Sequence, residues 1–198
     1  MPRREVGSQL TRHAPAGRVE SDPGGSGGRP GHRYGCAVEL RLARPDDAEA
    51  TRDIYNAEVT GSTVTFDMVP RSLREQRAWI DARSGAMAVV VAEHEGEVVG
   101  FASLSSYRDR PAYSTTVEDS VYVRGDQRGT GVGRLLLAEV VDVASTRGFH
   151  TVMARIVGGH DASINLHRSL GFEMVGIERE VGRKFGRWLD VVVMQRLL

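Results

Sequence analysis

The sequence is poor in cysteine, has no excess charge of either sign and has no long apolar run. Its only cysteine is Cys36, so the 198-residue chain can form neither an internal disulfide nor a cysteine cluster for zinc. Lysine and arginine together number 26, as do aspartate and glutamate, so the chain has no net charge that would attract it to nucleic acid or membranes. No apolar run could span a bilayer. We therefore expect a cytoplasmic protein with no metal site and no nucleic-acid or membrane partner.

The first residues differ in composition from the rest of the chain. They include "DPGGSGGRPGHRYG", which is rich in glycine, arginine and proline and poor in large apolar side chains. Such a segment cannot bury enough surface to offset the entropy lost on ordering. We predict a disordered extension over residues 1–37 and one folded domain over residues 38–198.

Hydrophobic periodicity predicts an α/β fold in the order β-α-α-β-β-β-α-β-α-β-β. Alternating or continuous apolar patterns predict strands at 38–43, 86–93, 97–107, 115–123, 151–157, 172–182 and 188–198. Helical spacing predicts helices at 44–59, 72–83, 135–144 and 161–170. Ser72 and Glu75 have the spacing of a capping box, and Gly171 is suited to a left-handed C-terminal cap.

The stretch "SVYVRGDQRGTGVGRLLLAEVV" joins a predicted strand to an apolar helix through a glycine-rich loop. A loop of this kind directs several backbone N–H groups toward one point at a helix N-terminus, where an anion binds. Arg128 and Arg134 flank the loop, which favours a phosphate ligand. No Lys-Ser or Lys-Thr follows, so a P-loop is excluded. A dinucleotide fingerprint is excluded as well, since its third glycine would fall on Arg134 or Leu136.

"RGTGVG" fits the pattern Arg/Gln-x-x-Gly-x-Gly/Ala and resembles the pyrophosphate loop of the GNAT superfamily, which binds acyl-coenzyme A. "TVEDSVYVRGDQRGTGVG", "ASINLHRSLGFE" and "VGRKFGRWLDVVVMQ" together resemble the phosphinothricin and methionine sulfone or sulfoximine N-acetyltransferases. Those enzymes acetylate the α-amine of small amino acids or their analogues. The resemblance covers residues 38–198 and implies the GNAT fold, a mixed central sheet flanked by helices. Leu189 after Trp188 is similar to the methionine sulfone type.

The resemblance implies acetyl-CoA as co-substrate and Glu118 as the base that takes a proton from the amine, directly or through water. Alternation places Glu118 on one face of its strand and Asp119 among valines on the other, which indicates a bulge or a site. His167 stands where many members have a tyrosine that protonates the leaving thiolate. A histidine packed beside the cofactor is the alternative. His160 stands where the family usually has a cofactor-binding asparagine.

The remaining site residues also follow from the resemblance. Those expected to contact acetyl-CoA through backbone N–H groups or side chains are Val121, Tyr122, Val123, Arg128, Gly129, Thr130, Gly131, Val132, Gly133, Arg134 and His160. Those expected to contact the acceptor are Arg108, Asp109, Arg110, Glu118, Asp119 and Ser120. A guanidinium can hold an acceptor carboxylate with two parallel bonds, although simple surface charge is the alternative for the loop 108–110.

Three functions stay open at this point. The first is an N-acetyltransferase for a small-molecule amine, with the homodimeric assembly common in the family. The second is an acetyltransferase for a protein N-terminus or lysine, which would need an open groove. The third is a non-catalytic acetyl-CoA-binding module.

Overall fold

The computed structural model describes residues 38–83 and 85–198, so the extension predicted over 1–37 lies outside the described residues. A seven-stranded sheet has the order β1-β2-β3-β4-β5-β7-β6. Its strands are β1 (Glu39–Leu42), β2 (Val89–His94), β3 (Glu97–Ser106), β4 (Thr116–Val123), β5 (Thr151–Val157), β6 (Glu173–Lys184) and β7 (Arg187–Leu197). The helices are α1 (Ala48–Gly61), α2 (Leu73–Asp81), α3 (Val132–Thr146) and α4 (Asp161–Ser169). This is the predicted order of strands and helices.

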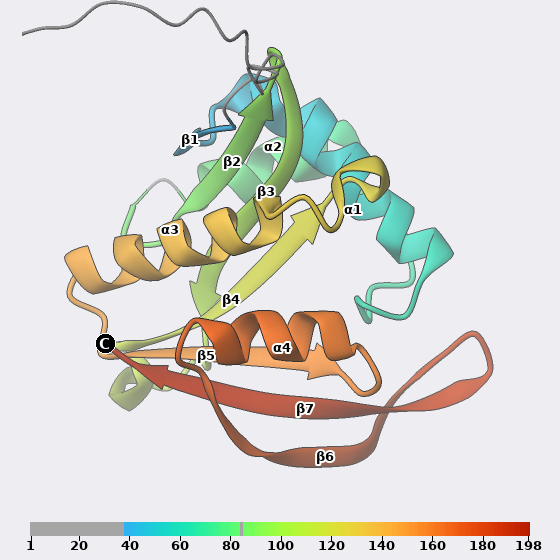
Figure 1. Ribbon diagram of the computed structural model, residues 1–198, viewed down its shortest axis with the longest axis vertical. Coiled ribbons are helices and arrows are strands. Elements are labelled where there is room, and N and C mark those ends of the chain that lie inside the picture. Colours follow the sequence, from blue (N-terminus) through green and yellow to red (C-terminus); the bar gives the residue numbers. More distant parts are fainter. Residues whose placement is uncertain (1–37, 84) are drawn as a thin grey trace, which may run out of the picture. The chain divides into compact units, whose positions relative to one another are not determined.

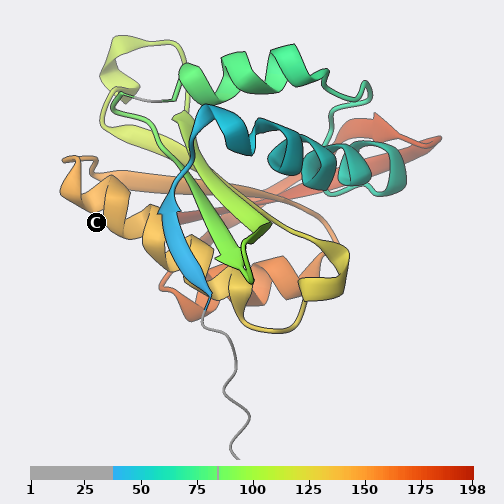
Figure 2. The same cartoon turned by 90° about the horizontal axis from the view of Figure 1, so that it is seen from above.

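Two helical layers cover the sheet, with α1 and α2 on one face and α3 and α4 on the other (Figures 1 and 2). Along each central strand, successive side chains point alternately to the helices on one face of the sheet and to those on the other. Val90 of β2 belongs to the core under α3, whereas Val91 packs with Ile54 of α1. The valine-rich strands are therefore buried from both sides, as continuous apolar runs predict. Among the described residues, none of the helices combines the length and apolar character needed to cross a membrane.

Local signals in the sequence account for the element boundaries. The turn between β2 and β3 has φ of 53° at Glu95 and 80° at Gly96, the positive pair that a type I′ hairpin requires. Helix α2 begins after the predicted capping box, in which Ser72 Oγ accepts from the Glu75 amide at 3.3 Å. The Glu75 carboxylate accepts from the Ser72 amide at 2.7 Å. Gly171, with φ of 82°, follows α4 as predicted.

The sheet divides in its middle. Strands β4 and β5 are its only parallel neighbours among the described strands, and they pair only from Thr116–Glu118 to Thr151–Met153. Beyond these pairs the two strands diverge, as Figure 1 shows. The second halves of β4 and β5 therefore border an opening. Strand β4 stays in regular register with β3 throughout, so the alternative of a bulge at Asp119 is wrong.

Candidate functional site

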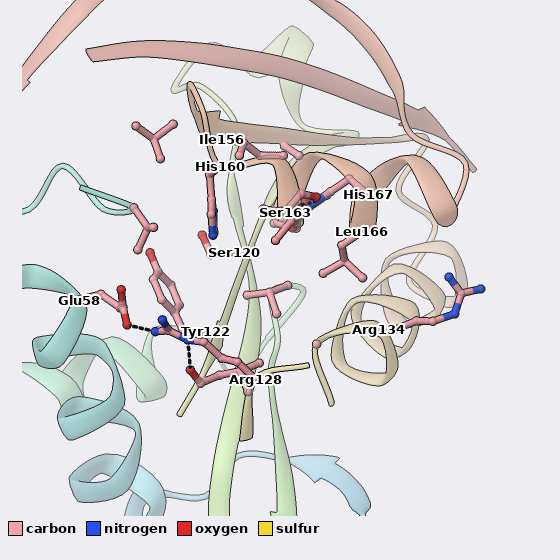
Figure 3. Close-up of a pocket in the computed structure, with 18 of the residues that line it drawn as sticks. Glu58, Ser120, Tyr122, Arg128, Arg134, Ile156, His160, Ser163, Leu166 and His167 are labelled. Atoms are coloured by element: carbon pink, nitrogen blue, oxygen red, sulfur yellow. Dashed lines mark hydrogen bonds and ion pairs between the residues drawn. The ribbon is translucent and has the colours of Figure 1, made fainter. Parts of the chain in front are cut away.

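The opening between β4 and β5 forms a pocket with a volume of about 400 Å³ (Figure 3). Its lining includes Val121 and Val123, which pack against the core on the α3 and α4 side. It also includes Ser120 and Tyr122, which alternate with them and face the α1 and α2 side. Because side chains from both faces of the sheet line it, the pocket passes through the sheet. Two ligands could therefore meet inside it from opposite faces.

The glycine loop borders the pocket at the start of α3. Gly129 and Gly131 have φ of 77° and 96°, a region that favours glycine. The backbone N–H groups of 129–133 have no hydrogen-bond acceptor in the part of the chain that the structure describes. They lie at the N-terminus of a 15-residue helix, where the dipole adds positive potential. This cradle of free donors suits a diphosphate.

Most of the residues predicted to contact the cofactor do line the pocket: Val121, Tyr122, Val123, Arg128, Gly129, Gly131, Gly133, Arg134 and His160. Thr130 and Val132 do not line it. The hydroxyl of Thr130 instead closes the loop by donating to the Gln127 carbonyl at 2.7 Å.

Both arginines that flank the loop have protein partners. The Arg128 guanidinium forms a short ion pair with Glu58 of α1, drawn in Figure 3, and its Nε donates to the Val123 carbonyl at 3.3 Å. Glu58 is 8% exposed and lines the pocket. Arg134 donates to Ser169 Oγ at 2.5 Å. Glu58 was missed in the sequence because its partner lies on a distant element.

Asp119 and His167 form a buried pair on the α4 side of the pocket. Their exposed fractions are 5% and 3%, and His167 Nε2 lies 3.1 Å from Asp119 Oδ2. The other ring nitrogen, Nδ1, lies 2.7 Å from the Ser163 carbonyl oxygen, which can only accept. Both ring nitrogens therefore donate when Asp119 is a carboxylate, which makes His167 an imidazolium. The pairing with His167 explains why Asp119, a charged residue, lies on the apolar face of β4.

Burial alone would lower the pKa of His167, but the hydrogen bond and negative charge of Asp119 outweigh it, so the pKa is raised. Asp119 Oδ1 is buried and has no hydrogen-bond partner among the described residues. Since a buried carboxylate oxygen without a donor is costly, this atom offers an acceptor to a ligand in the pocket.

His160 occupies the N-cap position of α4 and lines the pocket. Burial lowers its pKa, and the nearby positive charge of Arg128 lowers it further. Its neutral ring can donate one hydrogen bond and accept one, as a ligand-binding amide would.

Glu118 lies on the opposite face of β4 from Asp119. Burial raises its pKa, and this outweighs the opposing effect of Arg155 on β5. Glu118 itself does not line the pocket, but Ser120 and Arg155, which share its face, do. A half-buried carboxyl with a raised pKa beside a pocket is suited to general-base chemistry.

The predicted acceptor loop 108–110 stands at the margin of the site. In the described part of the chain, Arg108, Asp109 and Arg110 do not line the pocket. Arg108 is exposed, and its Nη2 donates to the Tyr107 hydroxyl at 3.3 Å. Its charge still acts on Glu118, whose pKa it lowers slightly against the larger effect of burial.

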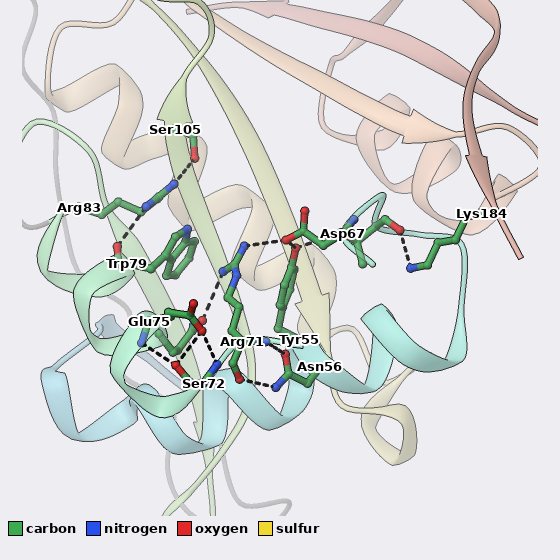
Figure 4. A network of polar contacts seen from close by, with 12 residues as sticks. Tyr55, Asn56, Asp67, Arg71, Ser72, Glu75, Trp79, Arg83, Ser105 and Lys184 are labelled. Atoms are coloured by element: carbon green, nitrogen blue, oxygen red, sulfur yellow. Dashed lines mark hydrogen bonds and ion pairs between the residues drawn. The ribbon is translucent and has the colours of Figure 1, made fainter. Parts of the chain in front are cut away.

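The loop between α1 and α2 carries Val64 to the pocket and is held by a polar network (Figure 4). The Tyr55 hydroxyl donates to Asp67 Oδ2 at 2.5 Å and lies 3.0 Å from Thr65 Oγ1. From the other side, the buried Lys184 of β6 donates to the Thr65 carbonyl at 2.8 Å. These bonds fix the wall of the pocket on the α1 and α2 side.

A parallel strand pair that separates beside a glycine-rich helix N-terminus is the architecture of acyl-CoA N-acyltransferases, and this chain has it. The chain belongs to the GNAT family: the family described as "Acetyltransferase (GNAT) domain" matches residues 40–193.

Among similar proteins, the L-methionine sulfoximine/L-methionine sulfone acetyltransferase of Pseudomonas aeruginosa is 42% identical, covering 80% of this chain and 94% of its own. A crystal structure of a phosphinothricin acetyltransferase from Sinorhizobium meliloti in complex with AcCoA is 40% identical, with a TM-score of 0.79 over 81% of this chain and 88% of that one. A ribosomal-protein-alanine N-acetyltransferase from Brucella melitensis is 41% identical, with a TM-score of 0.80 over 81% and 99% of the two chains.

Proposed function

We propose that this protein transfers acetyl from acetyl-CoA to the amine of a small amino acid or an analogue of the phosphinothricin or methionine sulfone type. The observation that carries the proposal is the pocket through the sheet, which joins the glycine loop to the face that bears Glu118 and Arg155. Relatives named for acetylation of such amino-acid analogues support it.

The residues present fit acetyl-CoA. The free N–H groups of 129–133 would hold the diphosphate, and the backbone of 121–123 would pair with the pantetheine arm as a strand does. His160 and the unpaired Oδ1 of Asp119 offer further hydrogen-bonding groups in the same pocket. Backbone N–H groups near Val121 and Tyr122 are the proposed donors to the oxyanion that develops on the thioester carbonyl.

Glu118 is the proposed base. The amine must lose a proton to attack the thioester carbonyl; an N–C bond then forms and the C–S bond breaks. Glu118 accepts the proton, directly or through water, and its raised pKa improves it as a base near neutral pH. The two N–H groups of the His167 imidazolium are held by Asp119 and Ser163, so one of these hydrogen bonds must break before His167 donates a proton to the departing thiolate; the ring is then reprotonated from solvent. The acceptor nitrogen loses two protons, the first through Glu118 and the second to solvent as the amide forms, and one proton is placed on the thiolate, so one proton is released for each acetyl group transferred.

Glu118→Gln tests this role. The change preserves size and removes the basic carboxylate, so kcat/KM should fall by about two to four orders of magnitude, with acetyl-CoA affinity retained. Thiol release across pH is the measurement. The deficit should shrink as pH approaches the pKa of the acceptor amine, because more acceptor arrives neutral. A variant with near-normal rates at neutral pH would exclude Glu118 as the base.

A second acceptor class has one specific observation in its favour, the resemblance to a protein named for acetylating a ribosomal-protein alanine. The same assay separates the two, since free amino acids and peptides can be compared side by side. Acetyl-CoA binding without thiol release from any amine would leave only a non-catalytic binding module.

We further infer a cytoplasmic homodimer. Strand β6 is at one edge of the sheet, and an edge strand with exposed apolar residues favours association. The exposed large apolar residues of the β6–β7 hairpin are Met174, Val175, Ile177, Val181, Phe185, Trp188 and Leu197. Light scattering after size exclusion tests the dimer: a single species of 21.6 kDa would contradict it.

A further inference from the structure

Strand β5 carries an arginine at an unusual position. In "TVMARIV" all residues apart from Arg155 and the initial Thr151 are apolar. Arg155 lies in the second half of the strand, where the pairing with β4 has ended. Alternation places its side chain with Met153 and Val157, opposite Ala154 and Ile156, which pack in the core under α3 and α4. Arg155 therefore lines the pocket on the face that bears Glu118.

Glu178 of β6 holds the Arg155 guanidinium from outside the pocket. Nη1 donates to Oε1 at 2.9 Å and Nη2 to Oε2 at 2.5 Å, so the pair is bidentate. This partner raises the pKa of Arg155, so the guanidinium stays charged. The bond uses one hydrogen on each of the two Nη atoms, and a guanidinium has five. Nε has no acceptor among the described residues, so one edge of the fork is fixed in place and still available to a ligand carboxylate.

Arg155 and Glu118 provide opposite charges on one face of the sheet, Arg155 in the lining of the pocket and Glu118 beside it. They do not form an ion pair in the part of the chain that the structure describes, yet the charge of Arg155 acts on Glu118 by lowering its pKa against the larger effect of burial. An α-amino acid carries an ammonium and a carboxylate on one carbon. It can therefore present its amine to Glu118 and its carboxylate to Arg155 at once, whereas a peptide N-terminus has no carboxylate beside its amine.

We propose that Arg155 is the residue that selects acceptors with an acid group beside the amine, and that Glu178 positions it. This inference rests on the proposed function and narrows it to free amino acids and acidic analogues. Strands β5 and β6 then contribute to acceptor specificity together with any contacts from the exposed loop 108–110.

The test compares an amino acid with its carboxamide, using methionine sulfone and methionine sulfone amide as acceptors. Rates are expressed per concentration of neutral amine, because the two α-amines differ in pKa. The wild-type protein should favour the acid. Arg155→Met should raise KM for the acid by about 10- to 100-fold, the effect of losing a charge-assisted bidentate contact, and leave KM for the amide within about threefold. Arg77→Met, at an exposed position of α2, is the matched control and should change neither.

Folding is checked by acetyl-CoA titration and thermal melting of each variant. If Arg155→Met does not fold, Arg155→Lys replaces it. This variant keeps the charge and loses the planar fork, so it should lose part of the acid preference. Equal losses for acid and amide, or a wild-type protein that acetylates both equally, would overturn the selection by Arg155 and leave the proposed acetyltransferase intact. Acetylation of neither would reject both proposals.

Discussion

Asp119→Asn is the substitution that tests the charge state of the Asp119–His167 pair. It keeps the shape of the side chain and an acceptor for His167 Nε2, and it removes the negative charge. The side chains of His167 and Asp119 are 4% and 1% exposed, so solvent screens the interaction little. Hydrogen bonds to charged groups contribute about 1.5–3 kcal/mol and neutral ones about 1 kcal/mol. We therefore expect Asp119→Asn to lower the free energy of unfolding by about 1–2 kcal/mol at acidic pH.

The penalty has a definite pH dependence. The pKa of His167 is raised in the folded protein above its ordinary value of 6.5, so the pair stabilises the fold fully below pH 6.5. That contribution is lost as pH rises through the folded pKa. Without Asp119, burial alone would lower the pKa of His167, and protonation at low pH would oppose folding. The difference between wild type and Asp119→Asn should therefore be largest near pH 5.5 and shrink toward pH 8.5.

Urea unfolding at three pH values measures this difference, and ¹⁵N chemical shifts of the His167 ring report its protonation directly. Asp142→Asn makes the same charge change at an exposed position of α3 and should give a penalty near zero throughout. A penalty for Asp119→Asn that is constant from pH 5.5 to 8.5, with a neutral His167 ring in the wild type at pH 5.5, would refute the ion pair.

Two further predictions concern the cofactor side. Gly131→Ala should cost about 1–2 kcal/mol of stability through its φ of 96° and weaken acetyl-CoA binding. At Gly133 an added Cβ would lie 3.5 Å from Leu166 and 3.6 Å from Val123, an ordinary contact, so Gly133→Ala should keep stability. Calorimetric titration of both variants with acetyl-CoA then separates the effect of backbone strain from the loss of cofactor contact. An unchanged affinity for acetyl-CoA in both variants would show that the glycine loop is not part of the cofactor site. Glu58→Gln should tighten acetyl-CoA binding by about three- to tenfold, because Glu58 then no longer neutralises Arg128. Glu49→Gln is the control. An unchanged Kd of Glu58→Gln for acetyl-CoA would place Arg128 away from the phosphates.

The sequence was sufficient for features whose cause is local. The capping box at Ser72 and the cap at Gly171 each depend on a few neighbouring residues, and each was predicted. The alternation of β4 also predicted correctly that Asp119 and Glu118 face opposite sides. The element order followed because the apolar runs and helical repeats are long and uninterrupted.

Contacts between distant elements could not be read in the same way. Glu58 and Arg128 are 70 positions apart, and Arg155 reaches Glu178 across the intervening strand β7. Neither pair has a spacing that a local pattern could signal, since tertiary packing alone brings the partners together. The sequence does contain one indication of the Arg155 pair, because this charged residue lies in a largely apolar strand. Asp119 is likewise a charged residue on the apolar face of β4. In both cases a specific partner explains the charge, Glu178 for Arg155 and His167 for Asp119.

The length of the β4–β5 pairing determines whether the site exists. Side chains alternate along β4, so Glu118 and Asp119 are adjacent in the chain but lie on opposite faces of the sheet. In a closed sheet a base on one face and an acid on the other could not act on the same bond. Because pairing with β5 ends at Glu118, the residues that follow border an opening, and groups on the two faces have access to one volume. Two or three additional ladder pairs between β4 and β5 would close that opening, and the acceptor and the cofactor could then no longer meet.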